Sequence, residues 1–68
     1  MDQLNITNEP LTLAVNPEQL AAALGISKPT AYEMLHISGF PALRVGKRWL
    51  IPCRALEAWL EKNVGKEF

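Results

Sequence analysis

The sequence has few of the features that mark secreted or membrane-spanning proteins. Cys53 is the only cysteine, so no disulfide can form within the chain and no cysteine-rich metal site exists. No run of about twenty apolar residues occurs, which argues against a membrane-spanning helix. The first residues show no succession of basic, apolar and small residues, so we expect no secretory signal. Together these absences favour a cytoplasmic location and no membrane partner.

The residues that build common catalytic sites are equally scarce. The chain has one histidine, His36, and it has no glycine-rich phosphate loop, no suggestive carboxylate pair and no metal-ligand cluster. Its 68 residues are also too few to enclose a sizeable substrate pocket. We therefore expect no enzyme, no cofactor, no metal ion and no small-molecule substrate. Cys53, as a lone cysteine, is interpreted as unreactive rather than as a redox sensor.

Net charge is zero, but the charges are unevenly distributed along the chain. Residues 1–26 carry three acids and no base, for a net charge of −3. Residues 27–54 carry five basic residues and one acid, for a net charge of +4, and residues 55–68 have a net charge of −1. Local charge, not the total, determines contacts with phosphates. The central segment is therefore the candidate for binding nucleic acid.

Residues 16–25 are typical of a short amphipathic helix and its end. Asn16 is a suitable cap, Pro17 fits the first helical position, and Gln19 stands where a capping box places an amide. Gly25 can adopt the left-handed conformation that closes a helix. The apolar stripe of this helix is predicted to consist of Leu20, Ala23 and Leu24.

A second helix is predicted to follow after a tight turn. Ile26 is expected to insert between the two helices, and Ser27 to cap a helix from Lys28 to about residue 37. Pro29 is tolerated because N–H groups of a first turn have no intrahelical acceptor. The inward side of this second helix is predicted to carry Ala31, Met34 and Leu35. Its outward side is predicted to carry Lys28, Tyr32, Glu33 and His36.

The remaining segments predict a small amount of β structure and a third helix. Alternating apolar residues at 11–15 indicate a short strand, and residues 38–41 end the second helix, with Phe40 returning to the core. Two short apolar runs flank Gly46-Lys47, which is typical of a two-residue hairpin. A helix is predicted from residue 54 to about 63, with Leu56, Trp59 and Leu60 on its apolar stripe.

The order strand, helix, helix, hairpin, helix indicates a winged helix-turn-helix, a mainly α fold with a small β-hairpin. We expect this domain to span residues 11–64, between a flexible tail at 1–10 and a C-terminal tail at 65–68. The chain resembles the excisionase-type small DNA-binding proteins, relatives of the winged MerR-like domains. The matching segments, whose order and spacing carry the resemblance, are LAAALGIS (20–27), PTAYE (29–33), FPALRVGKR (40–48), IP (51–52) and ALEAWL (55–60). One departure is Cys53, where a basic or polar residue is expected.

The candidate DNA contacts on the second helix are its first polar side chains. An exposed polar helix start can enter the major groove, where all four base pairs are distinguishable. Glu33 could accept a hydrogen bond from a cytosine amine, although it could equally be a solvated residue, and His36 is interpreted as lying beyond reach of the groove. The candidates are Ser27, Lys28, Thr30, Tyr32 and Glu33.

The hairpin supplies a second group of candidates, namely Arg44, Lys47 and Arg48. Three cations on a tight turn can reach the minor groove or the flanking phosphates. The alternative interpretation is that these charges only protect an exposed strand edge from aggregation. Both tryptophans are predicted to belong to the core, Trp59 on the third helix and Trp49 as the anchor of the hairpin.

These observations predict sequence-specific binding to double-stranded DNA. The resemblance implies an excisionase-like architectural factor for recombination of a mobile element, with a recombinase or integrase as a protein partner, or a small transcriptional regulator. The expected oligomeric state is a monomer, or weak self-association on DNA. The alternative from a different class is a protein-interaction module that has kept the fold without DNA binding, which the zero net charge favours.

Overall fold

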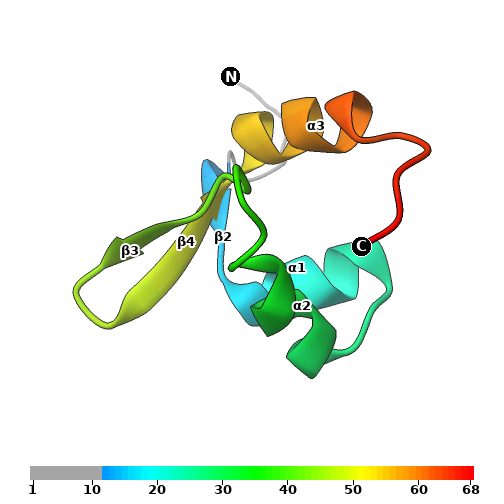
Figure 1. Cartoon of the computed structure of the whole chain (residues 1–68). Helices are drawn as coiled ribbons and strands as arrows, with labels where there is room; N and C mark the ends of the chain where they lie inside the picture. The colour runs from blue at the N-terminus through cyan, green and yellow to red at the C-terminus, as the bar shows by residue number, and fades with distance from the viewer. Residues whose placement is uncertain (1–11) are drawn as a thin grey trace, which may run out of the picture.

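Three helices and a three-stranded antiparallel sheet form the part of the chain that the computed structural model describes, residues 12–68 (Figure 1). The predicted fold class, a winged helix-turn-helix, is confirmed. Residues 1–11, which include the predicted tail and the start of the predicted strand, lie outside the described residues. The elements are β2 (Ala14–Val15), α1 (Pro17–Leu24), α2 (Lys28–Met34), β3 (Leu43–Val45), β4 (Arg48–Pro52) and α3 (Cys53–Lys62).

Helix α1 begins and ends as its sequence predicts. The Gln19 N–H donates to Asn16 Oδ1 at 2.7 Å, and the Asn16 N–H donates to Gln19 Oε1 at 2.9 Å, so the capping box is complete. Gly25 closes the helix with φ of +71°, a conformation that favours glycine. Because both ends are fixed locally, the direction in which the chain enters the turn to α2 is fixed as well.

The buried stripe of α1 differs by one position from the prediction. Ala23 is exposed, whereas Ala21 is buried together with Pro17 and Leu20. Pro17, Leu20, Ala21 and Leu24 are spaced i, i+3, i+4 and i+7, which is one helix face. The prediction of Ala23 was wrong because Pro17, treated only as a helix starter, is itself buried.

Helix α2 is capped by Ser27, whose Oγ accepts from the Thr30 N–H at 3.2 Å. The helix ends at Met34, earlier than the predicted residue 37. The N–H groups of residues 35–37 donate to carbonyls three residues back, at 3.1–3.2 Å, so the last turn is wound more tightly than an α-helix. Leu35 and then Phe40 reach the core as predicted, at 7% and 8% exposure.

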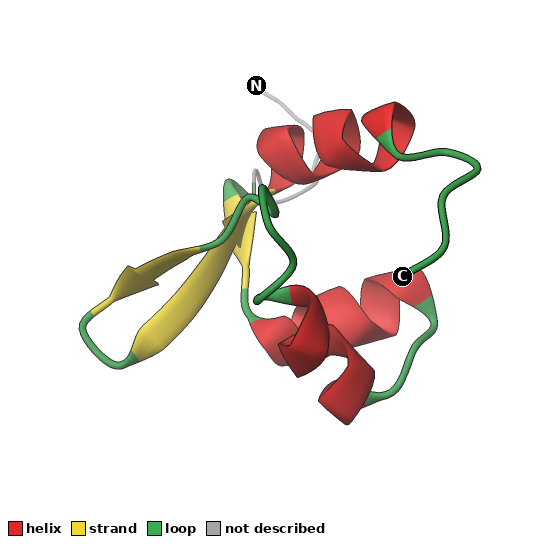
Figure 2. Cartoon of the chain, viewed as in Figure 1, coloured by secondary structure: helices red, strands yellow, loops and turns green. Residues whose placement is uncertain are grey.

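Strand β4 is the centre of the sheet, with β2 on one side and β3 on the other. The predicted hairpin is confirmed, and β3 and β4 form a wing that projects away from the helices (Figure 2). Gly46 has φ of +64°, and no residue other than glycine has a positive φ among those described, so the turn has the pattern of type II′. Pairing of Val15 with Ile51 ties the start of α1 to the wing.

The core is small and lies where α1, α2, β4 and α3 meet. Leu20, Ala31 and Ile51 are fully buried at 0% exposure. Trp59 of α3 is half-buried and packs edge-to-face on Phe40, with ring centroids 4.9 Å apart.

Helix α3 starts at Cys53, one residue before the predicted start, and the Cys53 N–H donates to the Leu13 carbonyl at 2.9 Å. No helix in residues 12–68 has both the length and the apolar character needed to cross a bilayer.

Candidate nucleic-acid interface

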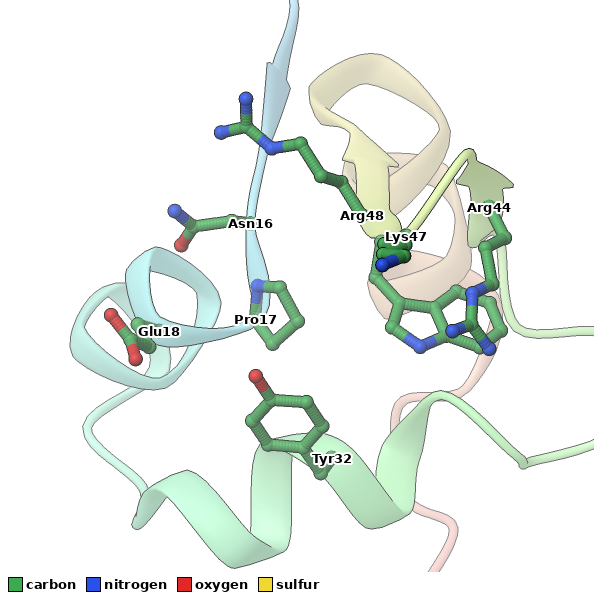
Figure 3. Close-up of a pocket in the computed structure, with 8 residues that line it drawn as sticks. Asn16, Pro17, Glu18, Tyr32, Arg44, Lys47 and Arg48 are labelled. Atoms are coloured by element: carbon green, nitrogen blue, oxygen red, sulfur yellow. The ribbon is translucent and has the colours of Figure 1, made fainter.

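A cleft of about 420 Å³ separates the wing from the start of α1 and the exposed side of α2 (Figure 3). Three sets of residues line it. The wing contributes Arg44, Lys47, Arg48 and Trp49; the start of α1 contributes Asn16, Pro17 and Glu18; and α2 contributes Tyr32. One wall is therefore cationic, whereas the opposite wall presents amide, carboxylate and phenol groups.

The wing wall holds all three cations that the sequence singled out. Arg44, Lys47 and Arg48 are exposed at the end of the molecule farthest from the core. No ion pair to any of them occurs among the residues described, so their charges face solvent. In Figure 3 the Arg48 side chain reaches across the cleft toward Asn16. Such a wall is suited to an anion that enters from solvent, as a phosphate does.

Tyr32 is the residue that connects α2 to the cleft. Its side chain is 45% exposed, and its hydroxyl points toward Pro17 at the opening of the cleft (Figure 3). A hydroxyl placed there can donate to a phosphate or a base edge while the ring remains packed on the helix. Contact by Tyr32 and contact by the wing are therefore compatible with one bound molecule.

Trp49, predicted to be a core anchor, is half-buried: it packs against the core cluster and also lines the cleft. The Arg44 guanidinium carbon lies 5.4 Å from the centroid of the Trp49 ring, within the range of a cation–π contact. The rings of His36 and Trp49 also make an edge-on contact, with their centroids 6.2 Å apart and their planes at 83° to each other. His36 itself is exposed, as predicted.

The remaining helix candidates are exposed but lie outside the lining of the cleft. Ser27 is engaged in capping, and its hydroxyl donates to Thr30 Oγ1 at 2.8 Å. Lys28 Nζ lies 3.8 Å from Glu18 Oε2, and both side chains are more than 60% exposed. Glu33 is exposed on the outer side of α2. An exposed pair at this distance contributes little stability, so Lys28 remains available to another anion.

Thr30 lines a surface other than the cleft. It lines an apolar groove of about 300 Å³ between the ends of α1 and α2 and the C-terminal segment, together with Met34, Trp59 and Phe68. Four of the eight candidates therefore line the cleft: Tyr32, Arg44, Lys47 and Arg48. The other four, Ser27, Lys28, Thr30 and Glu33, do not.

The cleft also contains four residues that were not predicted from the sequence as site residues: Asn16, Pro17, Glu18 and Trp49. The first three were considered only as parts of a helix start, and that start reaches the cleft because β2 pairs with β4 immediately before it. The alternating apolar residues at 11–15 were the available signal, since a strand there had to pair with the hairpin. Glu18 is the one acid in the lining and reduces the positive charge of the cleft.

A comparison with family models places the fold in a known class. The family described as "Helix-turn-helix domain" matches residues 15–64, which include every helix and strand from α1 to α3. The chain belongs to this helix-turn-helix family. The match supports DNA binding and double-stranded DNA as the partner class, and it identifies no finer subfamily. The comparisons with curated proteins and with solved structures found no match.

Proposed function

We propose that this helix-turn-helix protein binds duplex DNA with α2 in the major groove and the wing on the adjacent phosphates and minor groove. The observation that carries the proposal is the cleft, in which three exposed cations of the wing face Tyr32 of α2 and the start of α1. A double helix is the ligand whose phosphates and groove could contact both walls simultaneously.

The two walls have different roles in this proposal. Helix α2 reads sequence, because side chains in the major groove meet a distinct pattern of donors and acceptors for each base pair. In this proposal Tyr32 and Glu33 contact base edges, Lys28 contacts a base edge or a phosphate, and Ser27 and Thr30 contact phosphates at the start of the helix. The wing residues Arg44, Lys47 and Arg48 anchor the domain, since phosphates and the minor groove carry little sequence information.

Local charge supports binding despite the zero net charge. The +4 segment 27–54 contains both α2 and the wing, whereas six of the seven acids, at positions 2, 9, 18, 57, 61 and 67, lie in other segments of the sequence. Glu18 faces the cleft and pairs with Lys28 at 3.8 Å. Electrostatic attraction to phosphates depends on the charges within about a Debye length, roughly 10 Å at 0.1 M salt.

The biological role that fits a domain of this size is architectural or regulatory. As in the excisionase-type proteins that the sequence resembles, the protein would assist a recombinase at the ends of a mobile element, or regulate transcription of a nearby gene. The proposed state is a monomer with weak self-association on DNA, in the cytoplasm where that DNA resides. The proposed activity is binding, without catalysis.

Chemical-shift mapping tests this proposal at residue level. ¹⁵N-labelled protein is titrated with a duplex from around its own gene and with a duplex of unrelated sequence. We expect the largest shifts at Tyr32 and at Arg44, Lys47 and Arg48, and smaller shifts at Glu57 and Glu61 on the outer side of α3. Shifts confined to α3, or none with either duplex at low salt, would contradict the proposal.

A second candidate function, a protein-interaction module, is favoured by one observation. The groove that contains Thr30 has an apolar lining with Met34, Ile37, Trp59 and Leu60, and it lies on α2 and α3, apart from the basic cleft. Apolar surface of this kind is typical of a docking site for a protein segment. Shifts at these residues on addition of a recombinase, without shifts on addition of DNA, would favour this second function.

A further inference from the structure

The three wing cations are not equivalent, because the guanidinium of one of them, Arg44, lies over the ring of Trp49. Arg44 and Trp49 are directly opposite each other in the β3–β4 register, so their side chains lie on the same face of the sheet. The Arg44 guanidinium carbon is 5.4 Å from the Trp49 ring centroid. Among residues 12–68, Arg44 is the cation that the structure places over this ring.

The Trp49 ring is in turn held by the body of the domain. Trp49 lies two residues from Ile51, which is 0% exposed, so the two side chains share the inward face of β4. The ring packs against the core cluster and meets the edge of His36, which follows α2, at 6.2 Å. The orientation of the ring is therefore fixed relative to α2, although Trp49 belongs to the wing.

We propose that Trp49 is a positioning residue that orders the Arg44 guanidinium in the cleft before DNA arrives. This inference rests on the proposed function. A free arginine side chain loses much rotamer freedom when it contacts a phosphate, and a side chain that already lies on a ring loses less. The Lys47 side chain, at the tip of the turn, loses its full rotamer freedom when it contacts a phosphate. Arg44 is thus the pre-ordered contact of the wing and Lys47 the flexible one.

A double-mutant cycle on DNA affinity tests the inference. At 0.1 M salt, loss of one phosphate contact in Arg44→Ala is expected to weaken binding on the order of eightfold. Trp49→Leu is expected to weaken it about two- to fivefold, the range for an exposed cation–π contact. In the Arg44→Ala background, Trp49→Leu should cause no further loss, whereas Trp49→Phe in the wild-type background should retain most of the affinity because it keeps a ring.

Lys47→Ala is the matched control, because it removes an equal charge from the same hairpin. In that background Trp49→Leu should still weaken binding about two- to fivefold. An equal loss from Trp49→Leu in all three backgrounds would show that Trp49 acts only through the stability of the wing, and would overturn the inference. Should Trp49→Leu fail to fold, Arg44→Lys replaces it: the salt dependence should be kept while affinity falls about two- to fivefold.

A measurement on the free protein separates this inference from the proposed function. The Arg44 side-chain protons should show an upfield ring-current shift that disappears in Trp49→Leu and persists in Lys47→Ala. Absence of that shift in the wild type would overturn the positioning role even if DNA binds. Conversely, if the Arg44 protons show the upfield ring-current shift but the protein binds no duplex, the proposed function is overturned, and with it the role of Trp49 in that function.

Discussion

The helix-turn-helix and the wing of this protein are built by different means. The two helices are capped at defined residues and bury Leu20 and Ala31 completely, so their arrangement follows from local signals and a shared core. The wing buries none of the residues of β3, and Val45 is 52% exposed. The comparison teaches that packing specifies the helices and the inner end of β4, where Ile51 is fully buried, whereas packing constrains the exposed strand β3 much less.

The largest expected effect comes from a change on the packed side of this comparison. Leu20→Ala removes a side chain at 0% exposure and should lower the free energy of unfolding by about 2–5 kcal/mol. Urea unfolding followed by circular dichroism measures it. Val45→Ala in the wing is the control and should change stability by roughly 0.5 kcal/mol or less. Equal losses from the two variants would show that the wing is packed as firmly as the helices.

The next largest effect should come from the charges of the wing. Lys47→Ala/Arg48→Ala removes two of the cations that line the cleft and should flatten the log–log salt slope of DNA binding by about two units. Specific and unrelated duplexes should be weakened about equally, on the order of 60-fold at 0.1 M salt. Fluorescence anisotropy with labelled duplexes measures both quantities.

A charge-matched control locates that effect in the wing. Lys62→Ala/Lys66→Ala removes two cations outside the cleft, from α3 and the segment after it, and should leave the salt slope nearly unchanged. If the wing variant loses discrimination between duplexes while keeping its affinity for unrelated DNA, the wing reads sequence and the assigned roles of α2 and the wing are reversed.

A smaller effect is expected from the hydroxyl of Tyr32. Tyr32→Phe keeps the ring and the fold but removes the group that points into the cleft, so the ratio of specific to non-specific affinity should fall roughly fivefold, about 1 kcal/mol. The duplex for this assay is selected by the wild-type protein from a random pool, and the salt slope should not change. An unchanged ratio would remove Tyr32 from the reading residues.

The sequence predicted the features of the fold that depend on near neighbours. The capping box of Asn16 and Gln19, the cap at Ser27 and the left-handed Gly25 involve residues within a few positions of one another. The turn at Gly46 was predictable for the same reason, since its chain reversal needs a positive φ at that position. These signals were sufficient for the order of elements and hence for the fold class.

Features that depend on distant segments could not be predicted in the same way. Which side of α1 is buried depends on how Pro17 packs against the rest of the domain, so Ala23 was chosen in place of Ala21. The tight last turn after Met34 depends on where Phe40 must reach the core. The position of Trp49 in the cleft depends on the pairing of three strands, whereas Trp59 could be assigned from its place on the apolar stripe of a helix.

The salt dependence of wild-type binding to duplex DNA tests the central claim most directly. Four neutralised phosphates predict a slope of log affinity against log salt of about −3.6. The four cations expected to supply them are Lys28, Arg44, Lys47 and Arg48. Anisotropy titrations of one duplex at five salt concentrations between 50 and 200 mM, roughly the range over which such slopes are measured, give the value. A slope near −3.6 supports a cationic interface, and a slope near zero, or no binding at 50 mM, would contradict it.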